Sequence, residues 1–508
     1  NDIVLGTALV DMYCRCGALV KAQQILNGFL FRDVVVWNTL ISEYVKNGQF
    51  EDVFSSYKRM QNEGLSPDTI TFACILKACG IKGELGRGKY VHSVIYSMGF
   101  LGKGAMLGTA LVDMYAKCAA LMLAQQVFDE LPFRDVVSWS ALISGYVQQG
   151  QCENSLKCFE QMEKEYLCPN EITFSCILKA CGSIGTINKG REIHGKMVTK
   201  GLLGKDNALG NALVDMYAIC GDLLEAKQVF DELLIRDTVA WSALISGYTR
   251  KGQVEEVLNC IEDMKSEGWS PDLITFACIL KACASIGLVS KGKEIHYEIV
   301  RKELHRKDIV LDTAIVDMYA KCGMPERALR LHIDLPHRDV FSWSALIAGY
   351  AQHGMDQKAL VCLEEMQYEG LPKNPVAYLG VLNALCHSGL VDQAQMFFAK
   401  MVKEYGIIPE LEHYICIIDL FGRAGQIEKA IAVIKGMPFS ECPAVWGSLL
   451  GACQKWQNVN LGRLAFKNIL QLNIYNDAAY ISMCSIYAAT NMLENVKTIK
   501  GMRAKLYL

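Results

Sequence analysis

The residues that could support catalysis are few, and their pattern is incomplete. A zinc-dependent nucleobase deaminase needs a His-x-Glu sequence and a later Cys-x-x-Cys, which together hold the metal and move protons. One His-x-Glu occurs, as His296-Tyr297-Glu298, but no Cys-x-x-Cys exists in the chain. His92 and His194 take the place of His296 in earlier copies of the same phrase, without the Glu. We therefore interpret His296 as structural and expect no metal, no cofactor and no enzymatic activity in residues 1–508.

Composition limits the kinds of partner. Hydrophobic residues make up 51% of the 508 residues, which favours a well-packed fold over disorder. Lysine and arginine number 51 and aspartate and glutamate 54, so the formal net charge is only −3. This balance excludes a strongly basic nucleic-acid-binding surface, and any positive charge that binds RNA must be concentrated locally.

Cysteine usage and hydropathy indicate the cellular setting. The 21 cysteines are odd in number and lie in apolar stretches, which is typical of reduced, buried thiols in an intracellular compartment. No apolar run reaches the roughly 18 residues that a membrane-spanning helix needs, so we expect no membrane partner. The chain begins with Asn1 and no Arg- and Ser-rich leader precedes the repeats, so we interpret the N-terminus as cut.

The strongest pattern is a repeat of 102 residues. It recurs at Trp37, Trp139, Trp241 and Trp343, and at the cysteines that end a DMY phrase, Cys16, Cys118, Cys220 and Cys322. The tryptophans stand beside apolar helix positions, so we expect them in the core rather than as stacking platforms. A period of this length is too long for one helical hairpin, so each unit must contain several.

Each 102-residue unit divides into three motifs of 35, 36 and 31 residues. The first complete set is Val34–Asp68, Thr69–Gly104 and Ala105–Asp135, and the same order of lengths restarts at Val136 and at Thr238. A 31-residue motif, Ile3–Asp33, precedes the first set, and two further motifs, Val340–Asn374 and Pro375–Glu410, follow the third set. Each motif carries two amphipathic helical patterns, separated in the first set by Gly48 and ended by Gly64 and Pro67. A lone hairpin cannot bury both faces, so the sequence predicts an all-α solenoid of stacked hairpins.

Several phrases recur almost unchanged, among them VVSWSALISGYVQQG, EITFSCILKACGSIG, NALVDMYAICGDLLEAKQVFDEL and GREIH. They resemble the motifs of plant pentatricopeptide repeat proteins of the PLS class, which alternate motifs of these three lengths. The resemblance covers essentially the whole chain and implies a right-handed α-solenoid superhelix. The tetratricopeptide alternative is disfavoured because its W-x2-L-G-x2-Y signature is missing.

The resemblance divides the chain after Cys442. Residues 1–442 would form the repeat array, which ends in a variant short motif, Leu411–Cys442. Residues 443–508 contain VWGSLLGACQ and AAYISMCSIYAA and resemble C-terminal extended motifs of the E type, apparently truncated. In this family such extensions belong to C-to-U RNA editing factors. Many of these continue into a cytidine-deaminase-like domain named after its terminal DYW tripeptide, which the uncut protein could carry.

Membership of this family would imply that each motif contacts one base of single-stranded RNA. The fifth residue would face the Watson–Crick edge, the last residue would complete the choice and the second would sandwich the base. An Asn amide suits uracil, a Thr or Ser hydroxyl suits a purine, a final Asp suits guanine and a final Asn suits adenine. The last residue could instead merely cap the next helix, and we expect it to do both.

Eight motifs yield a base under these rules. Their fifth and last residues are Thr7 and Asp33 (G), Asn38 and Asp68 (U), Thr109 and Asp135 (G), Ser140 and Asn170 (A), Asn211 and Asp237 (U), Ser242 and Asp272 (G), Thr313 and Asp339 (G), and Ser344 and Asn374 (A). The base-sandwiching residues would be Val4, Val35, Val137, Val239, Val310 and Phe341. The 36-residue motifs are expected mainly to set spacing. The predicted target is 5′-GUNGANUGNGANNNNNC, which ends on the edited C.

A basic residue often stands thirteenth in the 31- and 35-residue motifs. The series is Arg15, Lys46, Lys117, Arg250 and Lys321. These side chains could line a phosphate track, because contacts to the backbone are what position a bound strand. Alternatively, they are solvated charges that complement the helix dipole.

The leading hypothesis is the RNA-recognition subunit for C-to-U editing of a plastid or mitochondrial transcript. A deaminase-bearing protein or editing cofactor would then act in trans. A second hypothesis is an RNA-binding factor that stabilises or processes a transcript, which the C-terminal extension disfavours. A third is a protein-binding helical scaffold, which the recurring fifth and last residues disfavour.

Overall fold

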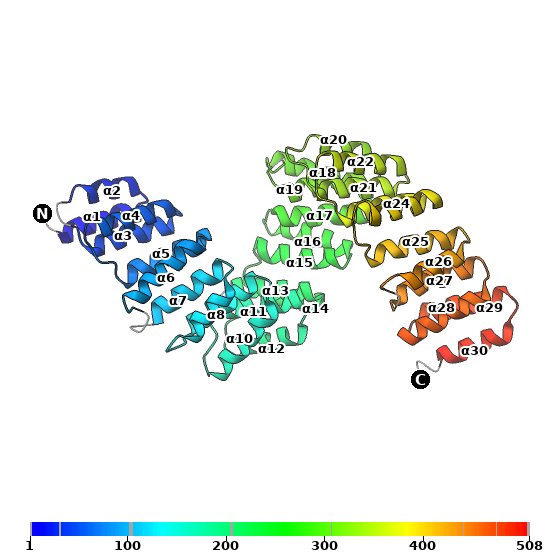
Figure 1. The fold of residues 1–508 in the computed structure, drawn as a ribbon, viewed down its shortest axis with the longest axis horizontal. Coiled ribbons are helices and arrows are strands. Elements are labelled where there is room, and N and C mark those ends of the chain that lie inside the picture. The colour runs from blue at the N-terminus through cyan, green and yellow to red at the C-terminus, as the bar shows by residue number, and fades with distance from the viewer. Residues whose placement is uncertain are drawn as a thin grey trace. The chain divides into compact units, whose positions relative to one another are not determined.

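The computed structural model describes residues 3–29, 32–100, 105–203, 207–305, 307–439, 441–473 and 475–504, leaving aside the side chains of residues 3–5 and 105. Within these ranges the chain forms thirty α-helices and no strand (Figure 1). The helices follow one another as hairpins, so the predicted all-α stack of helical hairpins is confirmed. None of the helices in these ranges is both long and apolar enough to cross a membrane.

The first helix of every hairpin begins at the residue where the sequence predicts its motif to begin. These helices are α1 (Ile3–Arg15), α3 (Val34–Lys46), α5 (Thr69–Lys82), α7 (Ala105–Lys117), α9 (Val136–Gln148), α11 (Glu171–Ile184), α13 (Asn207–Cys220), α15 (Thr238–Arg250), α17 (Leu273–Ile286), α19 (Ile309–Lys321), α21 (Val340–Gln352), α23 (Pro375–His387), α25 (Leu411–Arg423), α27 (Pro443–Lys455) and α29 (Asp477–Ala489). The agreement arises because the residue before each start, except Glu410 before α25, is a helix-capping type or precedes a proline.

The second helices complete the hairpins. They are α2 (Leu19–Asn27), α4 (Phe50–Asn62), α6 (Leu85–Ser97), α8 (Leu121–Asp129), α10 (Cys152–Lys164), α12 (Ile187–Thr199), α14 (Leu223–Glu232), α16 (Val254–Ser266), α18 (Val289–Arg301), α20 (Pro325–Ile333), α22 (Asp356–Tyr368), α24 (Val391–Lys403), α26 (Ile427–Gly436), α28 (Val459–Leu472) and α30 (Leu493–Ala504). Gly48 and Gly64 adopt φ of 71° and 76° after α3 and α4, a left-handed conformation that glycine reaches without a steric cost. Both predicted breaks are therefore confirmed.

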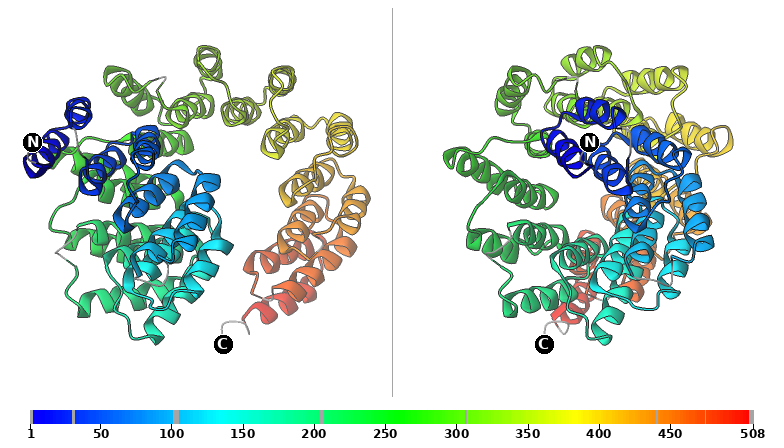
Figure 2. Two further views of the ribbon diagram at one scale, coloured as in Figure 1. Left: turned by 60° about the vertical axis from the view of Figure 1, so that its left-hand side comes forward. Right: turned by 90° about the vertical axis from the view of Figure 1, so that its left-hand side faces the viewer.

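The chain forms two compact units, Asn1–Gly247 and Tyr248–Leu508, which divide within α15. In each unit the first helices of successive hairpins pack on one another, as α5, α7 and α9 do in the first unit and α19, α21 and α23 in the second (Figures 1 and 2). After Pro443 the stack continues, because α27 packs on α25 and α29 on α27. The functional division after Cys442 remains a prediction.

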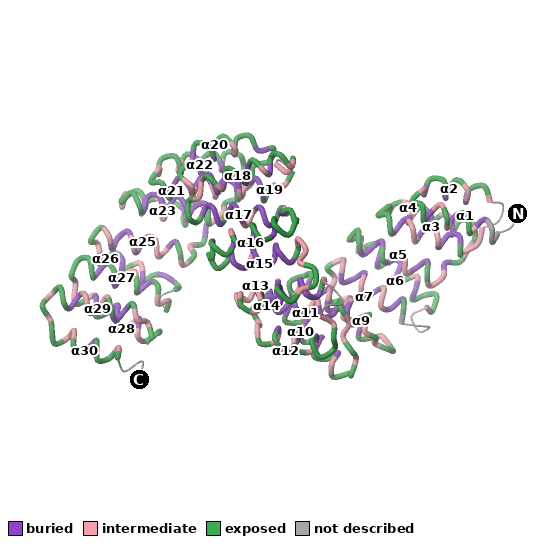
Figure 3. Tube along the Cα trace, turned by 180° about the vertical axis from the view of Figure 1, so that it is seen from behind, coloured by how far each residue is buried: buried purple, intermediate pink, exposed green. Residues whose placement is uncertain are grey.

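The core runs along the hairpins rather than gathering at one centre, and Figure 3 shows buried residues in hairpin after hairpin. Trp37, Trp139, Trp241 and Trp343 are all buried, which confirms their placement in the core. In three of them the indole Nε1 donates a hydrogen bond to a glutamate carboxylate: Trp37 to Glu63 (3.3 Å), Trp139 to Glu165 (3.1 Å) and Trp343 to Glu369 (2.9 Å). Each tryptophan immediately precedes a fifth residue, so the core fixes the helix at that place.

One core contact is chemically mismatched. Phe128 and Phe230 pack edge-on against Trp139 and Trp241, with ring centroids 4.5 Å apart in both pairs. His332 takes that place against Trp343 at 4.3 Å, fully buried, and neither ring nitrogen has a hydrogen-bond partner among the described residues. Burial lowers the pKa of His332 to about 4, so the ring is neutral near pH 7.

We predict that His332→Phe raises the stability of the protein. It removes an unsatisfied buried polar group that costs roughly 1–3 kcal/mol and restores the ring found in two of the other three copies. As pH falls from about 6.5 toward 4, the unfolded histidine binds a proton that the folded site resists, so the wild type loses stability that the variant keeps. Thermal melting at pH 7.5 and pH 5 measures both effects. The reverse variant, Phe128→His, should lower the melting temperature, and an unchanged melting temperature in both variants would contradict this account.

Candidate nucleic-acid interface

In most motifs the last residue caps the first helix of the next motif, whereas Cys442 forms no side-chain cap before α27. Asp68 adopts extended backbone, and its Oδ1 accepts a hydrogen bond from the backbone N–H of Thr71 at 2.8 Å. The same cap is formed by Asp33, Asp135, Asn170, Asp237, Asp272, Asp308, Asp339 and Asn374. The capping role that the sequence predicts is therefore confirmed, and each of these side chains is held in a fixed position.

Three predicted pairs of fifth and last residues are hydrogen-bonded to each other. Asn38 Nδ2 donates to both carboxylate oxygens of Asp68 at 2.9 and 3.0 Å, and Asn211 donates to Asp237 at the same two distances. The Ser140 hydroxyl lies 3.3 Å from Asn170 Oδ1. The fold thus brings side chains 26 or 30 residues apart in sequence to one point between successive hairpins.

The Asp68 carboxylate is held in its charged form. Burial acts to raise its pKa, but the hydrogen bonds donated by the Thr71 backbone, the Asn38 amide and the Thr71 hydroxyl together lower the pKa below its usual value. A last residue that stays ionised is an acceptor only, which is the property that the predicted recognition of N–H donors on a base requires.

The two Asn–Asp pairs differ in one neighbour. Asn38 Oδ1 accepts a hydrogen bond from the Thr71 hydroxyl at 2.6 Å. Asn211 has Ala240 in the corresponding place, and its Oδ1 is buried without a partner in the described part of the chain. Sequence analysis missed this third residue of the following motif, although Thr71 lies three residues after Asp68 and could have been examined as part of the cap.

The other predicted pairs are placed as follows. Thr7 is half-buried on α1, and Ser242 is buried on α15, where its hydroxyl donates to the Thr238 carbonyl oxygen at 2.7 Å. Thr109 and Thr313 have Oγ1 atoms that are buried and lack a partner within the described ranges. The Ser344 hydroxyl donates to the Val340 carbonyl oxygen at 2.7 Å. Thr109 and Thr313 therefore leave a hydrogen-bonding group unsatisfied at the reading position.

Two grooves, one in each unit, collect the predicted residues. The first, here the Thr109 groove, has a volume of about 860 Å³, and the second, the Thr313 groove, about 870 Å³. Predicted residues that line the Thr109 groove are Thr109, Lys117, Asp135, Val137 and Ser140; those that line the Thr313 groove are Val310, Thr313, Lys321, Phe341 and Ser344. Most residues in the two lists are exact equivalents two 102-residue units apart, so the groove is a repeated feature of the fold.

The predicted base-sandwiching residues are exposed apolar side chains. Val35 and Val137 are each 59% exposed, Val239 is 60%, Val310 is 66% and Phe341 is 69%, whereas the side chain of Val4 lies outside the described residues. The same second place is also apolar and exposed in Ile70, Met106, Ile172, Ile274 and Val376, which sequence analysis did not select. Applying the second-residue rule to every motif would have found them.

The thirteenth-residue cations are mostly paired on their own helices. Three of them form an ion pair with an aspartate four residues earlier: Arg15 with Asp11 at 2.9 Å, Lys117 with Asp113 at 2.7 Å and Lys321 with Asp317 at 2.8 Å. Lys46 pairs with Glu43. Arg250 is exposed in the last turn of α15. These acidic partners reduce the positive charge that the series presents. Its role in phosphate binding remains a prediction.

The His-x-Glu sequence is structural. His296 Nδ1 lies 3.0 Å from the Tyr319 hydroxyl, and burial lowers the pKa of His296 to about 4. Glu298 is held by Lys265 at 2.9 Å and Lys302 at 3.2 Å. In the part of the chain that the structure describes, no three His, Cys, Asp or Glu side chains are grouped to hold a metal ion.

Most of the cysteines are shielded by the fold. All 21 are free, and most are buried or half-buried as predicted, whereas Cys16 and Cys168 are exposed, contrary to the prediction for these two. Both lie outside helices, Cys16 in the turn after α1 and Cys168 in the loop after α10. Burial raises the pKa of Cys79, Cys362 and Cys386 to about 12, so these thiols stay protonated and are poor nucleophiles.

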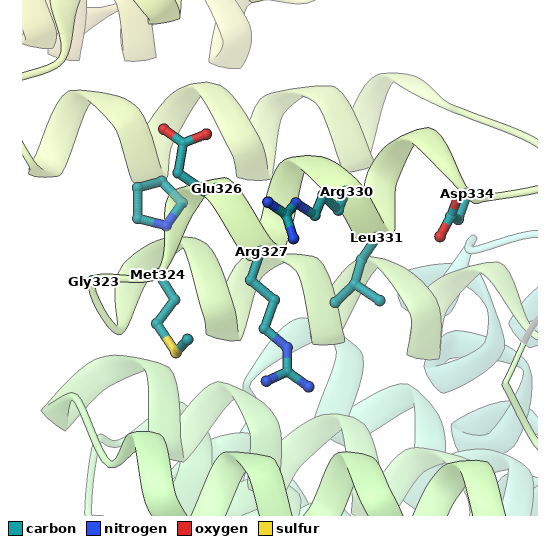
Figure 4. Close-up of a pocket in the computed structure, with 8 residues that line it drawn as sticks. Gly323, Met324, Glu326, Arg327, Arg330, Leu331 and Asp334 are labelled. Atoms are coloured by element: carbon teal, nitrogen blue, oxygen red, sulfur yellow. The ribbon is translucent and has the colours of Figure 1, made fainter.

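A third pocket lies along α20 and has a different character. Its lining includes Glu326, Arg327 and Arg330 but none of the predicted RNA-reading residues (Figure 4). Figure 4 shows Glu326 and Arg327 leaving α20 in opposite directions. Arg327 lies over the Tyr319 ring at 4.6 Å and Glu326 pairs with Lys358, so both side chains already have structural partners.

Comparison with known proteins identifies the family. The PPR repeat family model matches residues 32–80, 134–183 and 236–285, and the PPR repeat model matches residues 172–202, 211–237, 313–340, 341–371, 376–405 and 412–442. The pentatricopeptide repeat-containing protein At2g03380, mitochondrial, of Arabidopsis thaliana is 32% identical over 99% of this chain and 72% of its own length. At1g11290, chloroplastic, of the same plant is 34% identical over 98% of this chain and 61% of its own length.

A solved structure agrees with this assignment. The crystal structure of the pentatricopeptide repeat protein PPR10 in complex with an 18-nt psaJ RNA element aligns with a TM-score of 0.59 and 16% identity, covering 100% of this chain and 85% of that one. At this identity the match shows the fold. The protein described here is a helical-hairpin repeat protein, and the chain belongs to the pentatricopeptide repeat family.

Capping and base reading can be separated experimentally at Asp135. We predict that Asp135→Ala lowers stability by about 1 kcal/mol because the backbone N–H of Ser138 loses its acceptor. Asp135→Asn should cost little, since asparagine caps a helix as well as aspartate. Thermal melting of both variants tests this. Equal destabilisation by Ala and Asn would show that the charge of Asp135, rather than its cap, stabilises α9.

Proposed function

We propose that this protein binds single-stranded RNA with one base per motif and selects the site of C-to-U editing in an organellar transcript. The observation that carries the proposal is the recurring junction between hairpins, where a capping Asp or Asn meets the fifth residue of the preceding motif, as in Asn38–Asp68 and Asn211–Asp237. An exposed apolar second residue stands beside each junction. Together these supply hydrogen bonds to a base edge and a surface for its face.

The proposed target is 5′-GUNGANUGNGANNNNNC, read with the N-terminus toward the RNA 5′ end. The PPR10 structure holds an 18-nt RNA element, which supports single-stranded RNA as the ligand class. Relatives named as mitochondrial or chloroplastic support a plastid or mitochondrial location. The near-neutral charge of the chain favours a selective binder over a general one.

The base assignment is tested by exchanging fifth residues. We predict that Asn38→Thr changes the preference at the second base from U to G, because a threonine hydroxyl with Asp68 replaces an amide with Asp68. Thr109→Asn is the matched reversal and should change the fourth base from G to U. Each exchange should alter discrimination by ~1–3 kcal/mol, measured as the ratio of Kd values on RNAs that differ at one base. A preference for U that survives in Asn38→Thr would refute the assignment or its register.

Asp135 provides a second test of the code. Asp135→Asn keeps the cap and should move the fourth base from G toward A. Asp308→Asn is the control, because Asp308 also caps a helix but follows a motif with Ala277 at the fifth place. Its base preferences should stay unchanged.

The editing role rests on the PLS-type alternation of motif lengths and on the E-type character proposed for residues 443–508. These final hairpins would recruit a deaminase in trans or precede one in a longer protein. Sequencing of organellar transcripts after disruption of the gene tests this role. We expect editing to be lost at one or two cytidines preceded by the proposed word. Shortened transcripts with editing intact would favour a role in transcript protection instead.

A further inference from the structure

The 36-residue motifs carry a cation that is not explained by the fold. In three of the four motifs the ninth residue is a lysine, Lys77 on α5, Lys179 on α11 and Lys281 on α17, at steps of 102 residues, whereas the fourth has Asn383 on α23. All three are exposed, and none of their side-chain ammonium groups has a hydrogen bond or ion pair with any residue that the structure describes. Folding therefore gives no reason for a lysine at this place.

The thirteenth-residue cations have structural explanations that these lysines lack. Lys117 stands in the last turn of α7, where it complements the helix dipole, and it pairs with Asp113. Lys77 lies in the interior of α5, five residues before its end, where the dipole effect has faded. The ninth place is an aspartate in the 31-residue motifs, such as Asp113, and serine or alanine in the 35-residue motifs. Lysine at this place is thus specific to the 36-residue class.

Two of the three unpaired lysines face the grooves. Lys77 lines the Thr109 groove beside Ala73, and Lys281 lines the Thr313 groove beside Ala277. Ala73 and Ala277 are fifth residues that offer no hydrogen bond to a base. The same motifs present an exposed isoleucine at the second place, Ile70 being 48% and Ile274 61% exposed. Each therefore combines an apolar surface and a free cation with no reading group.

We propose that each of the three 36-residue motifs with this lysine binds one nucleotide of any base, with the ninth-residue lysine on its phosphate and the second-residue isoleucine against its base. This inference rests on the proposed function, in which the grooves hold single-stranded RNA. The 36-residue motifs then supply affinity rather than spacing alone. Phosphate contacts of this kind hold and orient a strand without carrying sequence information.

The charges near Lys77 are consistent with this role. The Thr109 groove contains Lys77, Lys117, Asp113 and Asp135. Asp113 and Lys117 neutralise each other, which leaves Lys77 and the capping carboxylate of Asp135. The Thr313 groove repeats the arrangement with Lys281, Lys321, Asp317 and Asp308, of which Lys321 and Asp317 are paired.

The test is a triple variant, Lys77→Gln, Lys179→Gln and Lys281→Gln, titrated with the proposed RNA over a range of salt concentrations. Each lost phosphate contact on a single strand reduces the slope of log affinity against log salt by about 0.7, so three should reduce it by about two. Affinity should fall equally on matched and mismatched RNA. The corresponding Lys→Arg triple should retain the wild-type slope.

The matched control is Lys58→Gln, Lys157→Gln and Lys293→Gln, three exposed lysines on second helices outside both grooves. The control should keep the wild-type slope, and thermal melting should show that all triples are folded. A wild-type slope in the groove triple, with base discrimination intact, would overturn this inference and leave the proposed function standing. Loss of base discrimination in the unmodified protein would instead reject the proposed function.

Discussion

The hydrogen bond from a helix N-terminus to the last residue of the preceding motif is the interaction on which the remaining structure depends. It fixes where each hairpin starts, and in Asp68 the same carboxylate also accepts the amide of Asn38. A cap of this kind contributes ~1 kcal/mol and is best supplied by Asp, Asn or Ser. The fold thus already restricts this place to short polar side chains. Asp and Asn both cap a helix, but only the Asn amide can also donate a hydrogen bond. The identity of the capping residue can therefore vary the hydrogen-bonding character of the junction without loss of the cap.

The core gives that junction its rigidity. Trp37 is buried directly before Asn38, and its indole nitrogen is held by Glu63, which also pairs with Arg32, the residue before the cap Asp33. The same indole–glutamate–arginine arrangement recurs around Trp139 and Trp343. A displaced helix would expose a large aromatic surface and break these bonds, so the fifth residue is held in place by packing that it does not itself provide.

Much of this organisation could be predicted from the sequence, because a repeat makes each local signal appear several times. The helix starts, the caps, the glycine breaks and the buried tryptophans all follow from residue type and spacing. What could not be predicted depends on contacts between motifs. The sequence does not reveal that the Thr71 hydroxyl donates a hydrogen bond to the side-chain carbonyl of Asn38, whereas Ala240 has no group that could donate one to Asn211. The sequence also does not show that the aspartate of the DMY phrase forms an ion pair with the basic residue four places later, as Asp113 does with Lys117.

The distribution of charge bears on how a nearly neutral chain could bind a polyanion. A free lysine placed in a motif that reads a base would be attracted to the reading carboxylate and would compete with the base for it. In the 31-residue motifs the basic residue is paired with an aspartate of its own helix, which keeps it from the cap. The unpaired lysines stand instead in motifs whose fifth residue is mostly alanine, where they have no reading group of their own to disturb. Under the proposed function, keeping base selection and phosphate attraction in separate motifs would give affinity for phosphate without loss of base discrimination.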